Sequence, residues 1–433
     1  SPEKKVYVGI AADIIHKGHI NILKTAKKYG RVIVELLTDN AIASYNSIPY
    51  LDYAQRKVVI ENIKFVDKVI PQKSLDYVEN LNLIKPDIVI HGDDWKKGVQ
   101  SKTRLRVIKT LKKWSGKLIE PKYTKDISST LIKKKINEII SVPNNRVSLL
   151  KRLIKAKSIV KILESHNALT GLIIENLKLN KNNKNIEFDG MWSSSLTDSA
   201  TKGLPDNSSL SFSDRISSLS HMMDVTTKPL VFDADNGGQI EHLPFLIRSL
   251  ERSGASAIIL EDKVGLKKNS LFKNQKGTKQ DKPKLFAKKI KKIFKSRQSQ
   301  DFMIIARIES FIVGKGLDDA LKRAEIYSKA GADAILIHSK EKTPAEIFSF
   351  AQEFKKSKNF LPLVSVPSTY SKVYEKELIK NGFKLVIYAN QLLRSAYPAM
   401  ENTAKAILKN TRAYEADKKI IPIKEIINLI KND

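Results

Sequence analysis

A ten-residue segment near the middle of the chain carries side chains suited to metal and anion chemistry. It spans residues 261–270, with the sequence EDKVGLKKNS, and follows an apolar run at residues 257–260. Carboxylates at the end of a buried strand can hold a hard cation directly or through its waters. Lys267 and Asn269 follow a glycine and could reach the charge of a substrate from a mobile lid. The segment therefore predicts a site for a metal-bound, anionic substrate.

A second group of candidate residues lies near the N-terminus, in the sequence DIIHKGH at residues 13–19. His16 and His19 at a helix start can converge on one phosphate, since Gly18 allows close backbone approach and the helix N-terminus favours negative charge. Taken alone, such a pair is equally a metal pair or a chance occurrence. Two later segments favour phosphate: HGDDW at residues 91–95 and ISST at residues 127–130, whose hydroxyls would cap a helix or bind phosphate. The chain has no Walker loop, which excludes the P-loop NTPases.

The first 140 residues alternate strands and helices. Apolar runs at residues 6–10, 32–37 and 87–90 predict strands, and residues 20–29 predict a helix. This alternation implies a mostly parallel sheet covered by helices. The pattern breaks at SVPNN, residues 141–145, where proline and paired asparagines indicate a linker. Residues 146–164 then predict one or two amphipathic helices with a break near Ala156.

In the remaining chain, short apolar runs end in polar residues and are separated by helical segments such as residues 317–329 and 344–355. Such repeated strand–helix units predict a (β/α)8 barrel, whose active site lies at the C-terminal ends of the strands. A single carboxylate there is more often a cap or a loop acceptor, but several together indicate catalysis. The Asn/Lys-rich residues 176–185 predict a loop. The polar strand ends are Asp233, Asp235, Glu261, Arg307, Glu309 and His338.

Composition limits the class of protein. The 433 residues are 42% apolar, which is enough for two cores, and the absence of cysteine excludes disulfides and thiolate metal sites. No apolar run is long enough to span a membrane and no signal peptide is visible, so a cytoplasmic location is expected. The net charge of +31 would suit a nucleic-acid or lipid binder, but the lysines are not interleaved with aromatics. Solvated helix faces and an anionic small substrate are therefore favoured over a nucleic-acid or membrane partner.

The motifs HxGH, GDDW and ISST make residues 4–140 resemble the cytidylyltransferase-like nucleotidyltransferases, with the glycerol-3-phosphate cytidylyltransferase branch most similar. The resemblance implies a Rossmann-like fold and attack of a phosphate or phosphonate oxygen on the α-phosphorus of CTP, with Mg²⁺ on the triphosphate. His16 and His19 would stabilise the transferring phosphoryl group. The chain departs from the family at YTKD, residues 123–126, and at Asn46. The implied nucleotide contacts are Gly9, His16, His19, Arg56, Asp94, Ser128, Ser129 and Thr130.

Residues 146 to about 410 resemble phosphoenolpyruvate mutase, within the isocitrate lyase superfamily. The resemblance rests on GMWSSS at residues 190–195, taken as the end of the first barrel strand, and on the lid and strand-end residues. It implies that phosphoenolpyruvate is isomerised to phosphonopyruvate and that Asp233, Asp235 and Glu261 hold Mg²⁺. Trp192, Ser193, Ser194 and Ser195 would bind substrate. Asp206, Lys267, Asn269, Arg307 and His338 would be catalytic.

The missing cysteine separates the chain from its lyase relatives, which carry a catalytic cysteine in the lid. Phosphonopyruvate hydrolase is the nearer rival, and Asn269 in the lid favours the mutase. Ser195 stands where mutases often have glycine. We therefore predict a bifunctional phosphonate-biosynthesis enzyme that also transfers CMP from CTP to 2-aminoethylphosphonate or 2-hydroxyethylphosphonate.

The predicted domains are a nucleotidyltransferase domain (1–140), a linker (141–145) and a mutase barrel (146–433). Barrels of this family commonly exchange a C-terminal helix, so a homodimer or homotetramer is expected. The alternatives are a phosphonopyruvate hydrolase with a nucleotidyltransferase domain, and a basic binding protein without turnover.

Overall fold

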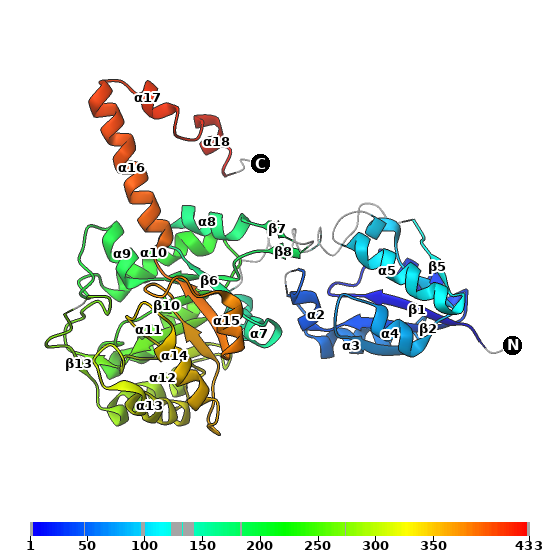
Figure 1. Cartoon of the computed structure of the whole chain (residues 1–433), viewed down its shortest axis with the longest axis horizontal. Coiled ribbons are helices and arrows are strands. Elements are labelled where there is room, and N and C mark those ends of the chain that lie inside the picture. The colour runs from blue at the N-terminus through cyan, green and yellow to red at the C-terminus, as the bar shows by residue number, and fades with distance from the viewer. Residues whose placement is uncertain are drawn as a thin grey trace.

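The computed structural model describes residues 3–46, 48–96, 100–122, 132, 143–181, 184–272 and 274–430. Figure 1 shows an N-terminal sheet domain and a C-terminal barrel. The N-terminal sheet is parallel throughout, in the order β3-β2-β1-β4-β5. The order reverses between β1 and β4, and ligands of such sheets bind at this switch point. Its strands are β1 (Lys5–Ile10), β2 (Arg31–Leu37), β3 (Lys68–Gln72), β4 (Ile88–Ile90) and β5 (Lys117–Ile119).

Successive side chains of these strands point to opposite faces of the sheet, and both sets are apolar. Helices therefore cover both faces. On one face Val6 and Val8 pack with residues of α1 and α3. On the other face Tyr7 and Val89 pack with residues of α4 and α5. The Rossmann-like prediction is confirmed. The helices are α1 (Lys17–Lys27), α2 (Asp39–Ala43), α3 (Tyr53–Glu61), α4 (Val78–Ile84) and α5 (Ser101–Leu111), with 3-10 turns η1 (Asp93–Lys96) and η3 (Lys112–Trp114).

The C-terminal domain is a closed parallel barrel, in the order β10-β11-β14-β15-β16-β17-β6-β9. Its interior is filled by apolar side chains, and residues of α7 (Pro143–Ala156) join this cluster. The barrel prediction is confirmed. Its strands are β6 (Val160–Glu164), β9 (Gly190–Ser193), β10 (Leu230–Asp233), β11 (Ala257–Glu261), β14 (Met303–Ile308), β15 (Ala334–Ile337), β16 (Leu363–Ser365) and β17 (Phe383–Tyr388).

Helices follow the barrel strands and pack on their outer faces. Helix α16 differs from the others, because it extends away from the barrel (Figure 1) and each of its residues is at least partly exposed. None of the helices in the described part of the chain is long and apolar enough to cross a membrane. The cytoplasmic location remains a prediction. The helices after α7 are α8 (Ala168–Asn176), α9 (Ser195–Thr201), α10 (Phe212–Asp224), α11 (Leu243–Arg252), α12 (Pro283–Ser296), α13 (Gly316–Ala330), α14 (Ala345–Phe354), α15 (Glu375–Lys380), α16 (Gln391–Asn410), α17 (Tyr414–Asp417) and α18 (Ile423–Ile427), with η4 (Ile240–His242) before α11.

Three local predictions differ from the structure. Residues 160–164 form strand β6 and not a helix, so GMWSSS ends the second barrel strand. The predicted loop at 176–185 contains a hairpin of β7 (Leu179–Lys181) and β8 (Lys184–Ile186). Helix α7 begins at Pro143, inside the predicted linker, because proline is tolerated in the first turn of a helix.

Candidate functional site

The C-terminal ends of the barrel strands form a polar layer above the apolar interior. Val231, Ile259, Ile305 and Leu336 point into the barrel. Side chains alternate along a strand, so the residues two positions later point into the same space. These residues are Asp233, Glu261, Arg307 and His338, and all four are buried. The structure thus brings together four of the predicted site residues in the barrel mouth.

The lid, residues 263–282, reaches over this layer. It carries the short strands β12 (Lys263–Val264) and β13 (Lys279–Gln280) at its two ends. Lys267 Nζ contacts Asp235 Oδ1 and Ser195 Oγ, and it lies 2.9 Å from Asp206 Oδ1. Asn269 Nδ2 donates to the other oxygen of Asp206 at 2.8 Å. Both lid residues singled out in the sequence therefore contact the catalytic face of the barrel.

The carboxylates beneath the lid fit a hard divalent cation. Asp235 follows Asp233 in a tight turn with a positive φ of 50°, and Ser195 Oγ donates to Asp233 Oδ2 at 2.9 Å. Oxygen donors of this kind suit Mg²⁺, which keeps several of its waters. Among the described residues no three Asp, Glu or His side chains converge closely enough to bind one ion together. With the side chains in these positions, an ion in the mouth would take fewer than three of them as direct ligands, and the metal contacts expected of Asp233, Asp235 and Glu261 remain a prediction.

Burial and neighbouring charges separate the pKa values of these groups. Burial would raise the pKa of Asp233, but the positive charges of Lys267, Arg215 and Arg307 outweigh it and lower that pKa to about 2. For Glu261 burial prevails over Arg307 and Lys263 and raises its pKa to about 7. The surrounding carboxylates overcome the effect of burial on Lys267 and raise its pKa, so it remains an ammonium. The mouth thus holds ionised Asp233 beside a Glu261 that titrates near neutral pH.

The barrel strands next to the carboxylate-bearing strands β10 and β11 present hydrogen-bond donors. Arg307 Nη2 lies 3.4 Å from Glu261 Oε2 and donates to Ser270 Oγ at 2.9 Å. Burial and then Arg307 lower the pKa of His338 to about 3, so its ring is neutral. Within the described structure His338 Nδ1 and Trp192 Nε1 are buried without a hydrogen-bond partner. Buried polar atoms are normally paired, so these two are suited to contact a polar ligand.

Glu164 belongs to the same layer and was not singled out in the sequence. It ends β6, two residues after the inward-pointing Ile162, and it pairs in register with Trp192. Its Oε1 lies 2.6 Å from His166 Nδ1, while Oε2 is buried without a partner in the described part of the protein. The alternation of Val160, Ile162 and Glu164 could have indicated a strand with Glu164 at its end. This segment was instead predicted to be helical, so Glu164 was not recognised.

The serine run divides into two roles. Ser195 faces Asp233 and Lys267 in the mouth. Ser193 Oγ instead donates to Asp198 Oδ2 at 2.7 Å, and Ser194 Oγ accepts from the backbone of Thr197 as the N-cap of α9. These two hydroxyls hold the local fold, and the carbonyls of the same residues accept from Arg215 and from the backbone of Asp198. The substrate contact expected of Ser193 and Ser194 thus remains a prediction.

The N-terminal motif forms a compact histidine pair at the start of α1. His16 Nδ1 accepts from the backbone of Gly18 at 3.1 Å, and the His16 and His19 rings lie 4.0 Å apart. Burial and then the proximity of His16 lower the pKa of His19 to about 4, so it is neutral at pH 7. After β4, His91 stacks on Trp95 with the ring centroids 3.8 Å apart, and Asp94 is exposed nearby. The two segments follow the strands that flank the switch point of the sheet.

Two other predicted nucleotide contacts have internal roles. A Cβ on Gly9 would lie 2.6 Å from the hydroxyl of Tyr77, so packing alone requires glycine there. Arg56 is fully buried and donates to the carbonyls of Ala11, Leu37 and Leu51 and to Asp39. Arg56 thereby holds the ends of β1 and β2, and its nucleotide contact remains a prediction. Ser128, Ser129 and Thr130 lie outside the described residues.

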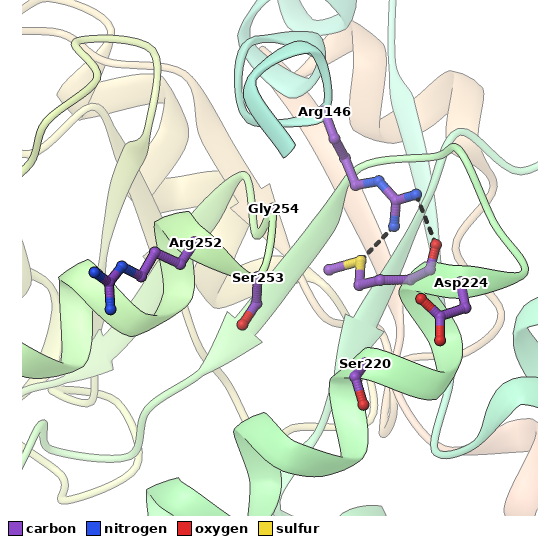
Figure 2. A pocket seen from close by; sticks show the side chains of 7 residues that line it. Arg146, Ser220, Asp224, Arg252, Ser253 and Gly254 are labelled. Carbon is purple, nitrogen blue, oxygen red and sulfur yellow. Dashed lines mark hydrogen bonds between the residues drawn. The ribbon is translucent and has the colours of Figure 1, made fainter. Parts of the chain in front are cut away.

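A separate cavity lies at the other end of the barrel. Figure 2 shows it between Arg146, Ser220, Asp224 and Arg252. The guanidinium of Arg146 donates to the carbonyl of Met223 at 3.1 Å, and the neighbouring loops lead into the N-terminal ends of β10 and β11. None of the predicted site residues lines this cavity. The catalytic chemistry of a barrel belongs at the opposite end.

Comparisons with known proteins match both domains. The family model for phosphoenolpyruvate phosphomutase matches residues 150–408, and the cytidylyltransferase-like model matches residues 7–135. The phosphoenolpyruvate phosphomutase of Tetrahymena pyriformis is 36% identical over 286 residues, which cover 66% of this chain and 91% of that protein. The glycerol-3-phosphate cytidylyltransferase of Staphylococcus aureus is 36% identical over 95 residues, covering 22% of this chain and 72% of the relative. A crystal structure of phosphonopyruvate hydrolase with oxalate and Mg²⁺ superposes with a TM-score of 0.58 at 30% identity, covering 66% of this chain and 94% of that one.

Proposed function

Because the chain belongs to the phosphoenolpyruvate phosphomutase family through residues 150–408 and to the cytidylyltransferase-like family through residues 7–135, we propose that it is a bifunctional phosphonate-biosynthesis enzyme. The barrel isomerises phosphoenolpyruvate to phosphonopyruvate. The N-terminal domain transfers CMP from CTP to a phosphonate such as 2-aminoethylphosphonate or 2-hydroxyethylphosphonate. The observation that carries the proposal is the closed lid, whose Lys267 and Asn269 meet the carboxylates of the barrel mouth.

The isomerisation breaks the bond between phosphorus and the enol oxygen and forms a bond between phosphorus and C3. Mg²⁺, held by Asp235 and through water by Asp233 and Glu261, would polarise the pyruvyl oxygens. Arg307 and His338 bind and orient the phosphoryl group with their N–H donors. The lid excludes water, which would otherwise capture the phosphoryl group in transit. Asn269 steadies that group, and Asp206 holds the amide of Asn269 in place.

Phosphonopyruvate hydrolase is the second candidate for the barrel, since a hydrolase structure aligns over most of the domain. The two reactions differ in whether water reaches the phosphoryl group. Incubation of the full chain with phosphonopyruvate and Mg²⁺, followed by ³¹P NMR, separates them. We expect phosphoenolpyruvate as the main product. Pyruvate with inorganic phosphate as the main product would refute the mutase assignment.

In the N-terminal domain, the neutral rings of His16 and His19 donate hydrogen bonds to the phosphates of CTP while the phosphonate oxygen attacks. An acceptor screen with CTP, scored by pyrophosphate release, tests this activity. The His16→Ala variant should lose pyrophosphate release and retain isomerisation in the barrel. Loss of both activities would contradict two independent sites.

We also propose a homodimer or homotetramer in which α16 packs on a second copy. Helix α16 exposes Tyr397, Met400 and Leu408 by 61% or more. An apolar cavity of 350 Å³ lies over the outer faces of β6 and β17, where Leu163 and Tyr388 line it. An exposed apolar stripe and an uncovered apolar hollow are complementary surfaces. Light scattering of wild type and of Leu408→Asp should give an oligomer and a smaller species, respectively.

A further inference from the structure

A buried cation behind the barrel mouth is not used by the proposed chemistry. Arg215, in helix α10, is only 2% exposed. Its Nε donates to Asp198 Oδ2 at 2.8 Å, and its guanidinium lies over the ring of Phe232 at 4.2 Å. Phe232 belongs to the apolar layer outside the barrel, whereas Asp233 points into it. Arg215 therefore approaches the site from behind and cannot touch a substrate in the mouth.

The guanidinium joins the ends of two neighbouring strands. Arg215 Nη1 donates to the carbonyl of Asp233, the last residue of β10. Its Nη2 donates to the carbonyl of Ser193, the last residue of β9, at 3.1 Å. The β9–β10 ladder ends at the pair Ser193 and Phe232, so the strands separate at this point. Arg215 thus holds them together where ladder hydrogen bonding stops.

The segments that leave this junction carry the site. One leads from Ser193 to Ser195, whose hydroxyl contacts Asp233 and Lys267. The other leads from Asp233 to Asp235, the proposed metal carboxylate. Asp198 fixes the arrangement from α9, because its Oδ2 accepts from both Arg215 and Ser193. A planar guanidinium can bridge several acceptors at fixed angles, whereas a lysine ammonium cannot.

We propose that Arg215, paired with Asp198, is a positioning residue that sets the distance between the Ser193–Ser195 segment and the Asp233–Asp235 turn. The proposal rests on the proposed isomerisation and extends it to a residue that touches neither substrate nor metal. A shift of about 1 Å in reacting groups can cost roughly a hundredfold in rate. Loss of the bridge should therefore lower kcat more than it raises KM, and it should weaken Mg²⁺ binding.

The chain provides a matched control at the other end of the barrel. Arg297 is also buried, donates to Asp333 Oδ2 at 2.6 Å and to the carbonyl of Phe302 at 2.7 Å, and lies 4.7 Å from the ring of Phe294. Phe302 and Asp333 precede β14 and β15, far from the mouth along the strands. Arg297 thus has the same kind of partners without a link to the proposed site.

The experiment compares Arg215→Lys with Arg297→Lys in the full chain. Both should lower the thermal midpoint. Arg215→Lys alone should lower kcat for phosphonopyruvate by about 10- to 100-fold and raise the Mg²⁺ concentration that gives half of the Mg²⁺-induced shift in midpoint. Equal kcat and equal Mg²⁺ response in the two variants would overturn the positioning role. Arg215 would then only stabilise the fold, as Arg297 does.

A double variant keeps the test valid if a single change prevents folding. Asp198→Val with Arg215→Met removes both buried charges, which avoids leaving one of them unpaired. It should repeat the losses in kcat and in Mg²⁺ response, and a wild-type kcat in this variant would also overturn the proposal. If the wild-type chain itself does not turn over phosphonopyruvate, the proposed function fails. The Mg²⁺ response of the midpoint still decides the role of Arg215 in that case.

Discussion

The ammonium of Lys267 lies among the carboxylates of the barrel mouth, so it should compete with a metal ion for them. It contacts Asp235 directly and Asp206 at 2.9 Å, and Asp233 and Glu261 are close enough to raise its pKa. The Lys267→Met variant keeps much of the side-chain volume and removes the charge. The remaining carboxylates then lose their counter-charge and can recover it only from protons or from a cation.

The size of the effect follows from the ion pairs. Two opposite charges about 4 Å apart attract by about 4 kcal/mol at an effective dielectric constant of about 20. Breaking a buried pair by removing one partner costs about 3–5 kcal/mol. In the variant, Mg²⁺ no longer has to displace the ammonium from the carboxylates. If Mg²⁺ binding gains about 3 kcal/mol for this reason, its affinity rises roughly a hundredfold. The variant should thus be less stable without metal, bind Mg²⁺ more tightly without substrate, and still lose turnover.

Calorimetric titration with Mg²⁺ and thermal melts over a range of Mg²⁺ concentrations measure both quantities. Lys268→Met is the matched control, because Lys268 lies in the same lid but its Nζ reaches only the carbonyl of Lys276 among the described contacts. The control should keep wild-type Mg²⁺ affinity. Equal or weaker Mg²⁺ binding by Lys267→Met would refute the competition.

Three further outcomes test other parts of the molecule. Burial raises the pKa of Glu35 to about 8 from an ordinary value of 4.5, so between these pH values the folded domain holds a proton that the unfolded chain lacks. Stability must then fall as the pH rises from 5 to 8, and Glu35→Gln should flatten this fall in thermal melts; an unchanged pH profile would refute the assignment. His338→Phe, which has no N–H donor, should lower kcat of the barrel by about 10²- to 10³-fold, as for loss of one preorganised donor, with pyrophosphate release from CTP unaffected. Gly9→Ala should destabilise the N-terminal domain by about 1–3 kcal/mol through overlap with Tyr77, seen as a lowered first transition in calorimetry, while isomerisation persists below that transition.

The barrel and its strand-end residues could be predicted from the sequence for a physical reason. Each buried strand is a short apolar run, and the first polar residue after it marks the point where the chain leaves the core. Asp233, Glu261, Arg307 and His338 follow this rule, and the structure places all four in one layer. The lid was predicted from its charges and its glycine, and in the structure Lys267 and Asn269 both contact Asp206.

The errors have equally local causes. The segment VKILE at residues 160–164 is too short to distinguish a period of two from a helical period, so β6 and Glu164 were missed. The run of three serines also does not show which face each side chain takes: the hydroxyl of Ser193 turns outward because side chains alternate after Trp192, and its substrate contact stays a prediction. Arg215 lies in an amphipathic helix, and only the folded backbone shows that its donors reach two strand ends.

The charges in the mouth constrain the order of binding. With the lid closed, Lys267 pairs with Asp206 and Asp235, and Arg307 pairs with Glu261 and Glu309. Glu261 has a pKa of about 7 and takes up part of the remaining negative charge as a proton. A divalent cation added to this set would place an ammonium next to a second positive charge in a buried space, which is costly unless an anion enters as well. Phosphoenolpyruvate carries that anionic charge. The lid should therefore close with Lys267 over the carboxylates either when the metal is absent or when metal and substrate are both present. Closure over the metal alone should be disfavoured.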